Sequence, residues 1–140
     1  YHALGTLRDI GGDEGDDIAH EYTHPQTGRA LLPTMGCWVQ MLRPGIRLKA
    51  HRHTGSAVYH VVQGEGSTVV DGQRFDWKKG DIFAVPPWAL HEHANASKSA
   101  DAVLFSIQDL PVLGALGLYY EEEYAENGGH QKVTSSFKAA

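Results

Sequence analysis

Residues 44–64 read PGIRLKAHRHTGSAVYHVVQG, and this stretch decides how the rest of the chain is interpreted. It places His51 and His53 two residues apart. Because alternate side chains of a strand point to the same face, both imidazoles can aim into one cavity, about 6–7 Å apart along the backbone. A second stretch, residues 80–95 (GDIFAVPPWALHEHAN), carries His91 after an extended Pro-Pro run. The sequence therefore predicts a small β-barrel that brings three imidazoles onto one metal ion.

The ligand type narrows the choice of metal. Three neutral imidazoles leave a divalent ion with its full charge and with open coordination positions. This set suits Fe(II), Zn(II), Ni(II) or Mn(II) rather than calcium or magnesium, which prefer oxygen ligands. The alternative interpretation is that these are ordinary surface or core histidines, and an HxH pair taken alone does not separate the two.

Four further side chains are candidates for contact with a substrate. If the HEHAN segment is extended, His93 shares the face of His91, where it could act as a hydrogen-bond donor or acid–base group, or equally be a core histidine. Gln40 could point into the same cavity and hold a polar substrate, or only satisfy backbone groups. Tyr59 is an even number of residues from His51 and His53, so its side chain should point to the same face of the sheet. It could donate a hydrogen bond to a substrate oxygen or only pack in the core. Trp88 is the tryptophan most favoured as a substrate platform.

Bulk properties limit the function classes. The chain has 140 residues with 12 basic and 17 acidic side chains, a net charge of −5, and no basic patch that would favour nucleic acid. No apolar run reaches the length of a membrane span, and no signal peptide is visible. The single cysteine, Cys37, cannot form an internal disulfide, so we expect a reducing, cytoplasmic location. Because the chain opens on Tyr1, we expect a processed chain or a piece of a longer one.

Short apolar runs separated by Gly-rich turns predict an antiparallel all-β sandwich or barrel. We expect an N-terminal arm or linker over residues 1–20, the barrel over 21–108, a helix over 109–127 with Asp109 as its N-cap, and a loose tail over 128–140. The expected strands span 36–42, 46–53, 57–63, 67–70, 73–77, 82–85, 91–94 and 102–107, with a kink at Gly55 and a hairpin turn at Asp71-Gly72.

The two stretches resemble the two-part cupin signature, G-x5-H-x-H-x3/4-E-x6-G followed by G-x5-P-x-G-x2-H-x3-N. Ala57 stands at the glutamate position, and Trp88 stands at the inner glycine of the second part. The resemblance implies an all-β cupin double-stranded β-helix, a jelly-roll barrel, with a short C-terminal helix. The matching residues are Gly45, His51, His53 and Gly64 in the first part, and Gly80, Pro86, His91 and Asn95 in the second.

Longer phrases resemble gentisate 1,2-dioxygenase and the related salicylate and 1-hydroxy-2-naphthoate dioxygenases, most closely their C-terminal cupin domain. The resemblance implies a non-haem Fe(II) held by His51, His53 and His91 without a glutamate. It also implies cleavage of a small hydroxylated aromatic acid with O2, with the substrate contacted by His93 and Gln40. The phrases are TGRALLPTMGCWVQMLRPG, HRHTGSAVYHVVQGEG, FDWKKGDIFAVPPWALHEHAN and AVLFSIQDLPVLGALGLYYEE.

One departure from that family keeps other interpretations open. Tyr59 stands where the catalytic N-terminal cupin has an arginine that holds the substrate carboxylate. This favours, as an alternative, a non-catalytic metal-binding cupin that serves assembly of a bicupin or oligomer. A third interpretation is a cupin with another small-molecule function, such as an isomerase or a ligand sensor. Since small cupins often pair by exchanging edge strands, we expect a homo-oligomer, most simply a dimer.

Overall fold

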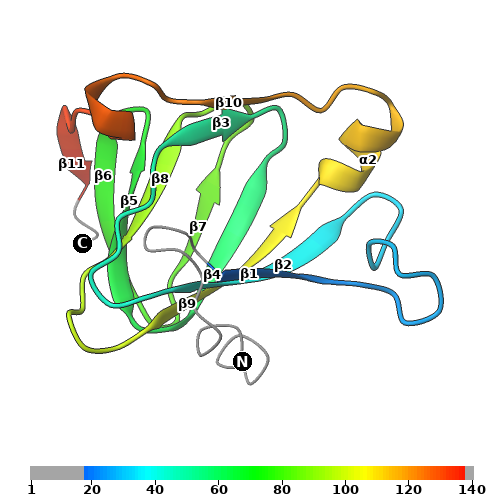
Figure 1. The fold of residues 1–140 in the computed structure, drawn as a ribbon, viewed down its shortest axis with the longest axis horizontal. Helices are drawn as coiled ribbons and strands as arrows, with labels where there is room; N and C mark the ends of the chain where they lie inside the picture. Colours follow the sequence, from blue (N-terminus) through cyan, green and yellow to red (C-terminus); the bar gives the residue numbers. More distant parts are fainter. Residues whose placement is uncertain (1–17, 138–140) are drawn as a thin grey trace.

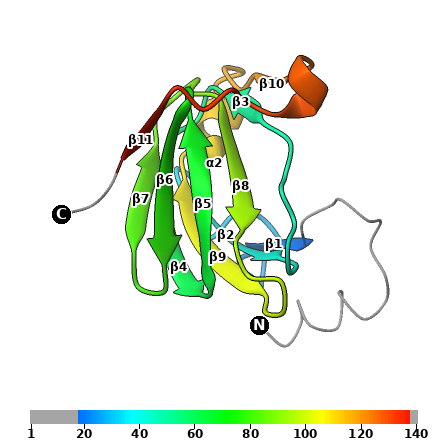
Figure 2. The same cartoon turned by 90° about the vertical axis from the view of Figure 1, so that its left-hand side faces the viewer.

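The computed structural model describes residues 18–137, which fold almost entirely as strands in two facing sheets (Figures 1 and 2). The first sheet has the order β1-β2-β9-β4-β7 and the second the order β10-β3-β8-β5-β6-β11. This arrangement confirms the expected all-β jelly-roll barrel. The strands are β1 (Ile18–Tyr22), β2 (Gly36–Leu42), β3 (His51–His53), β4 (Ala57–Gln63), β5 (Glu65–Val70), β6 (Gln73–Lys78), β7 (Ile82–Val85), β8 (His91–Asn95), β9 (Ala102–Gln108), β10 (Glu121–Glu123) and β11 (Ser135–Phe137).

The period-2 pattern of the strands determines which side chains face the barrel interior. In β4, Tyr59 and Val61 are buried while Val58 and Val62 are exposed. This alternation is typical of a strand with one face on the core. The main core cluster comprises Leu42, Ala57, Tyr59, Val61, Trp77, Val85, Ala89, Ala102 and Leu104.

The hairpin expected at Asp71-Gly72 is confirmed. It joins β5 to β6, and both turn residues have positive φ, 45° at Asp71 and 81° at Gly72. A two-residue turn of this kind matches the right-handed twist of the flanking strands, and the Asp-Gly pair accepts the conformation with little strain.

Strand β3 is shorter than the expected strand over 46–53. Its first residue, His51, pairs with His91 of β8. The residue before it leaves the ladder, because Ala50 donates its N–H to the carbonyl of Gly129 and accepts from the N–H of Tyr124. The C-terminal segment therefore takes the backbone bonds of Ala50, while Ile46 and Leu48 still bond to β8 through Asn95 and His93. Gly55, expected as a kink, lies in the turn between β3 and β4.

The helix expected over 109–127 is wrong in its extent. Helix α2 (Leu110–Ala115) has six residues, and Gly117 follows it with a φ of 68°, the left-handed conformation that commonly ends helices. Asp109 makes no capping bond, because its carboxylate accepts from the N–H and hydroxyl of Ser56 at 2.9 and 3.0 Å. The chain then crosses the end of the barrel to β10 (Figure 1). Within the described residues no helix is long and apolar enough to cross a membrane.

The expected domain limits also change at both ends. Ile18 already belongs to β1, so residues 18–20 are part of the sheet, and the rest of the expected arm lies outside the described residues. The expected loose tail contains the short 3-10 helix η1 (Asn127–Gly129) and then β11, which runs parallel to β6. Gln131, which follows η1 and precedes β11 in the sequence, is buried. Its side-chain amide donates to the carbonyl of Val69 and accepts from the N–H of Gly72. These bonds explain why residues 130–137 pack against the barrel.

Candidate metal centre

Three histidines from two neighbouring strands converge inside the barrel. His51 and His53 come from β3 and His91 from β8, and each offers a ring nitrogen within 4.8 Å of the others. The ring centroids lie 4.4 Å apart for His51 and His91, and 5.0 Å apart for His53 and His91. His51 lies directly opposite His91 in the pairing of β3 with β8. Because His53 is two residues after His51 in the same strand, its side chain points to the same face, and both imidazoles lie near that of His91. The structure thus brings together the three residues that the sequence selected as metal ligands.

Hydrogen bonds fix the orientation of two of these rings. The Nδ1–H of His53 donates to the carbonyl of Gly55 at 3.0 Å, and the Nδ1–H of His91 donates to the carbonyl of Ala89 at 2.9 Å. Since a carbonyl only accepts, both rings carry their proton on Nδ1 and present Nε2 as a lone pair. Nε2 of His91 is buried and has no partner among the described residues. An ion at this point would explain a buried nitrogen that is otherwise costly.

The protonation of the group also suits metal binding. Burial lowers the pKa of His91 to about 3, with the charge of His51 as the next cause. Burial likewise lowers the pKa of His53, opposed by the carbonyl of Gly55 and, more weakly, by the carboxylate of Glu121. A metal ligand must be neutral imidazole, so these shifts keep the nitrogens available near neutral pH. The donor set therefore fits a divalent transition metal.

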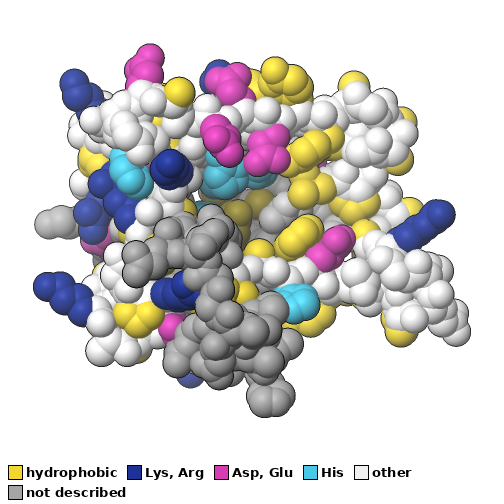
Figure 3. Space-filling model, viewed as in Figure 1, with side chains coloured by type: hydrophobic (Ala, Val, Ile, Leu, Met, Phe, Trp, Pro, Cys, Tyr) yellow, Lys and Arg dark blue, Asp and Glu magenta, His cyan; other side chains and the backbone are white. Residues whose placement is uncertain are grey.

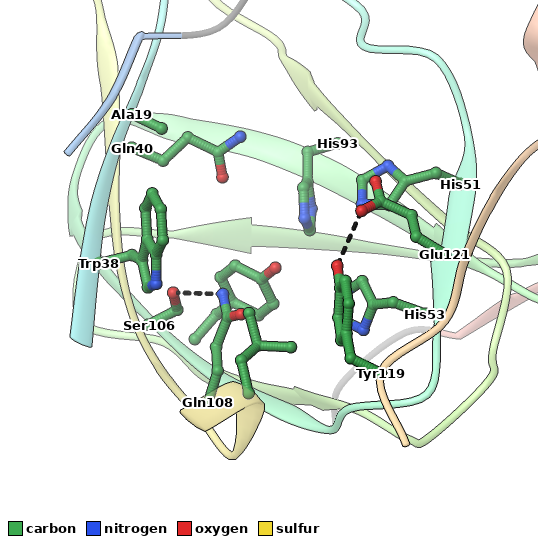
Figure 4. A pocket seen from close by; sticks show the side chains of 12 residues that line it. Ala19, Trp38, Gln40, His51, His53, His93, Ser106, Gln108, Tyr119 and Glu121 are labelled. Carbon is green, nitrogen blue, oxygen red and sulfur yellow. Dashed lines mark hydrogen bonds between the residues drawn. The ribbon is translucent and has the colours of Figure 1, made fainter. Parts of the chain in front are cut away.

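A cavity of about 290 Å³ opens beside the histidines, between the two sheets (Figure 4). Gln40, Tyr59 and His93, which the sequence selected as substrate-contacting residues, all line it. None of its described lining residues is Lys or Arg. The lining comprises Ala19, Trp38, Gln40, His51, His53, Tyr59, His93, Ser106, Gln108, Leu110, Tyr119 and Glu121.

His93 is held in a buried chain of hydrogen bonds. The indole Nε1–H of Trp77 donates to the hydroxyl oxygen of Thr68 at 2.9 Å, and that oxygen lies 2.8 Å from Nδ1 of His93. Nε2 of His93 is buried without a partner, and the ring packs edge-on against Tyr59 at 4.9 Å. Burial lowers the pKa of His93 well below its usual value. A neutral His93 thus presents Nε2 at the cavity wall.

Trp88 lies elsewhere. Its ring packs against Tyr120 at 5.6 Å and lies under the guanidinium of Arg52 at 4.5 Å, and it is not among the residues that line the cavity. Its backbone N–H donates to the carbonyl of His53 at 2.8 Å. The structure therefore places Trp88 against Tyr120 and Arg52, next to β3, and its role as a substrate platform stays a prediction.

Four polar lining residues were missed in the sequence, namely Ser106, Gln108, Tyr119 and Glu121. The last two lie in the range expected to be helical, where a strand register could not be assigned. The Tyr119 hydroxyl donates to the Glu121 carboxylate at 2.7 Å, and burial with this bond raises the pKa of Tyr119 to about 12. Figure 3 shows acidic side chains gathered beside histidine over β3 and β10, above a hollow. The two glycines of LGALGLYY are the signal that could have argued against a helix.

Comparison with known proteins gives consistent matches. The family model described as "Cupin domain" matches residues 38–108. A 5-aminosalicylate 1,2-dioxygenase from Comamonas sp is 48% identical over 126 residues, 90% of this chain and 33% of that protein. A 1-hydroxy-2-naphthoate 1,2-dioxygenase from Nocardioides sp. (strain KP7) is 39% identical over 114 residues, 81% of this chain and 30% of that protein. The chain thus spans about a third of the length of these relatives.

Solved structures agree with the sequence matches. A salicylate 1,2-dioxygenase from Pseudaminobacter salicylatoxidans superimposes with a TM-score of 0.76 at 28% identity, covering 86% of this chain and 35% of that one. A variant of that enzyme has been solved in complex with gentisate, with the same TM-score of 0.76 and 28% identity, and 33% of its chain covered. The ring-cleaving relatives and the three-histidine group therefore indicate the same kind of site.

Proposed function

This chain belongs to the cupin family, and on that premise we propose that it is a domain of a non-haem Fe(II) dioxygenase that cleaves a hydroxylated aromatic acid with O2. The observation that carries the proposal is the group of three imidazoles, two of them buried, at the edge of a cavity between the two sheets. Relatives that align with most of this chain are named as 1,2-dioxygenases of aromatic acids, 5-aminosalicylate and 1-hydroxy-2-naphthoate. We assign the extradiol type of cleavage as part of the same proposal.

His51, His53 and His91 would hold the metal. Fe(II) bound there would supply Lewis-acid attraction for the carboxylate and hydroxyl of the substrate and the redox chemistry that O2 requires. Burial lowers the pKa of His53 and of His91, and carbonyl partners orient both of these rings. Zn(II), Ni(II) or Mn(II) would fit the same nitrogens, so the assignment of iron rests on the named activity of the relatives.

The cavity suits a single aromatic ring. Its volume of about 290 Å³ is at the lower end of the range for small-molecule sites and exceeds the roughly 150 Å³ that holds benzene. Trp38, Tyr59 and Leu110 give it apolar and aromatic surface, and the amides of Gln40 and Gln108 add neutral hydrogen-bonding groups. We therefore propose a monocyclic acid such as gentisate or an aminosalicylate as the substrate class.

We assign His93 the acid–base role. Trp77 donates to the hydroxyl oxygen of Thr68, so Thr68 can give its own proton to Nδ1 of His93. The His93 proton then lies on Nε2, at the cavity wall, where it can be donated to a substrate oxygen. Gln40 and Tyr59 would position the ring rather than exchange protons with it.

A second candidate function is a metal-binding cupin without turnover. Tyr59 supports it, because this residue stacks on Phe83 at 5.0 Å and brings no charge to the cavity. With no Lys or Arg among the described lining residues, the metal would be the main attraction for a substrate carboxylate. Such a domain would bind the metal and contribute to assembly of a larger enzyme.

We also propose that the chain forms a homo-oligomer through the outer face of the first sheet. The outward positions of β4, β7 and β9 carry no Asp, Glu, Lys or Arg, which is unusual for a face turned to water. An uncharged face does not repel an identical copy, although the chain has a net charge of −5. The single cysteine, Cys37, remains the basis for proposing a cytoplasmic location. The exposed apolar residues on this face are Tyr22, Val58, Val62, Ile82 and Ile107.

The function is tested by loading the full chain with Fe(II) without oxygen, then adding gentisate or 5-aminosalicylate and air. Growth of the ring-cleavage product's absorbance, lost in His51→Ala and strongly reduced in His93→Gln, is the expected result. Stoichiometric iron without turnover would support the second candidate function. A chain that binds no metal would contradict both.

A further inference from the structure

We propose that Glu121 donates a carboxylate oxygen to the metal ion, as a fourth and anionic ligand beside the three histidines. The inference rests on the proposed metal centre and extends it to a residue outside both motif stretches. Glu121 is the one acidic residue among the described side chains that line the cavity. Four observations support this role.

The first is the register of β10 against β3. The two strands pair antiparallel with Glu121 opposite His53 and Glu122 opposite Arg52. Residues directly opposite in such a pair lie on the same face, with Cβ atoms about 4.5–5.5 Å apart. Glu122 accordingly points outward and contacts Arg52 at 2.7 Å, so Glu121 points inward with His53. Strand alternation therefore places Glu121 and Glu123 on the face of the metal ligands, opposite His53 and His51, and of these two glutamates only Glu121 lines the main cavity.

The second observation is the position of the carboxylate. Glu121 and His51 line both the main cavity and a neighbouring one, so the wall between the two cavities includes both residues. Figure 4 shows the Glu121 carboxylate between His51 and Tyr119. The Tyr119 hydroxyl donates to one carboxylate oxygen at 2.7 Å. We assign the other oxygen to the ion. Glu121 is exposed and lies outside the group of three histidines whose ring nitrogens are within 4.8 Å of one another, so its side chain would have to rotate toward the ion.

The third observation is the charge of the site. Three imidazole ligands bring no negative charge, so a divalent ion among them would keep two uncompensated charges in a largely buried place. Nε2 of His91 is fully buried without a partner, which independently indicates that a ligand belongs there. A carboxylate that approaches such an ion gains far more than it would in water.

The fourth observation is the support of β10. At one end Thr54 donates its N–H to the carbonyl of Tyr120 at 3.0 Å, and at the other Tyr124 donates to the carbonyl of Ala50 at 3.0 Å. The ring of Tyr120 also packs on Trp88 at 5.6 Å. Glu121 is thus carried by a strand fastened on both sides, which keeps the carboxylate close to the site before the metal arrives.

The test is a metal titration of the full chain with Co(II) and, separately, Zn(II), each against a competing chelator. Glu121→Gln keeps the size of the side chain and an acceptor for Tyr119. Two control variants are measured beside it. Glu122→Gln removes one negative charge from the outer face of β10, and Glu123→Gln removes one negative charge from the position opposite His51. Unchanged thermal unfolding of the apo-proteins shows that all variants fold.

We expect Glu121→Gln to weaken metal binding by about 10- to 100-fold and to change the visible absorption of bound Co(II). Glu122→Gln and Glu123→Gln should change the affinity less than about threefold. Equal weakening by Glu121→Gln and Glu123→Gln, or weakening without a change in the Co(II) spectrum, would overturn the proposal, because the carboxylate would then act only as a nearby charge. An unaffected Glu121→Gln would overturn it while leaving the three-histidine site intact. Failure of the proposed function would differ, since the unmodified chain would then bind no metal or bind it without turnover.

Discussion

In the proposed arrangement Thr68 gives its proton to Nδ1 of His93, and this makes a small buried residue important for the chemistry. Its hydroxyl oxygen accepts from Nε1–H of Trp77 at 2.9 Å and lies 2.8 Å from Nδ1 of His93. Thr68 itself has no exposed surface. Because water cannot replace this hydroxyl, the tautomer of His93 depends on it directly.

Replacing Thr68 by valine should therefore affect both stability and turnover. Two buried ring nitrogens lose their partner, so we expect the free energy of unfolding to fall by about 1–3 kcal/mol, measured by urea denaturation. The rate constant kcat should fall by about tenfold or more while KM changes little, because His93 would no longer be held in one tautomer. Thr68→Ser keeps the hydroxyl, so this variant should retain most of the free energy of unfolding and most of kcat. A valine variant equal to the unmodified chain in stability and kcat would contradict this role.

The buried histidines also predict how the metal-free protein responds to acid. The pKa of His91 is about 3 in the folded chain against 6.5 as its ordinary value, and the pKa of His93 shifts in the same direction. The unfolded chain therefore binds more protons, and stability is fully present above pH 6.5 and is lost as the pH falls toward 3. Each histidine contributes a slope of up to about 1.4 kcal/mol per pH unit.

Urea denaturation of the apo-protein between pH 7.5 and 4 measures this slope. His91→Asn should show a shallower decline than the unmodified chain, because it removes one of the titrating groups. A stability that is constant from pH 6.5 to 4 would show that these imidazoles are not held neutral by burial.

At the scale of elements, the local sequence pattern was sufficient to predict a strand where turn residues bound that strand. The Asp71-Gly72 pair and the alternation of β4 specify their own structure, and both agree with expectation. The HxH step and the later His91 also indicated a shared site, because strand periodicity fixes the direction of side chains. Nothing local could show that the chain after α2 returns to pair with β3, since that pairing depends on residues far apart in sequence. Tyr119 and Glu121 were missed for this reason.

The C-terminal segment illustrates the same dependence on distant residues. Glu92 is buried, and its carboxylate accepts from Nδ1–H of His130 at 2.7 Å and from the N–H of Gln131 at 2.9 Å. Arg47 contacts it at 3.3 Å from a half-exposed position. A charge in the middle of β8 is therefore stabilised largely by residues that the sequence suggested were a loose tail.

Ending the chain after Gly129 should therefore destabilise it by about 3–5 kcal/mol, because a buried carboxylate loses two of its partners. Urea denaturation measures the change, and a chain ended after Phe137 is the control, because it keeps the contacts described for residues 130–137. Adding Glu92→Gln to the shortened chain should recover part of the loss, since a neutral amide is less costly to leave unpaired. Equal stability of the two shortened chains would rule out this role of the segment.

At the scale of the whole molecule, the outer face of the first sheet predicts self-association. Ile82 is 70% exposed and Val58 is 47% exposed, on a face whose β4, β7 and β9 positions carry no charged residue. Burying such a face against a second copy gains about 25 cal/mol for each Å² of apolar surface removed from water. The expected result is a dimer in sedimentation velocity at micromolar concentration.

Val58→Lys and Ile82→Lys should each convert the dimer to a monomer without changing metal binding. Val133→Lys is the matched control, because Val133 is also 47% exposed but lies outside this sheet. A monomer at every concentration of the unmodified chain would exclude the interface, and a dimer that survives both substitutions would place it elsewhere.

The return of β10 to β3 also has a consequence for how the protein is made. A ribosome releases His51 and His53 first, His91 about forty residues later, and Glu121 about thirty residues after that. A growing chain that ends before His91 would offer an ion the first pair alone. The order of synthesis would therefore postpone firm capture of the ion until the residues of β8 and β10 have also been made.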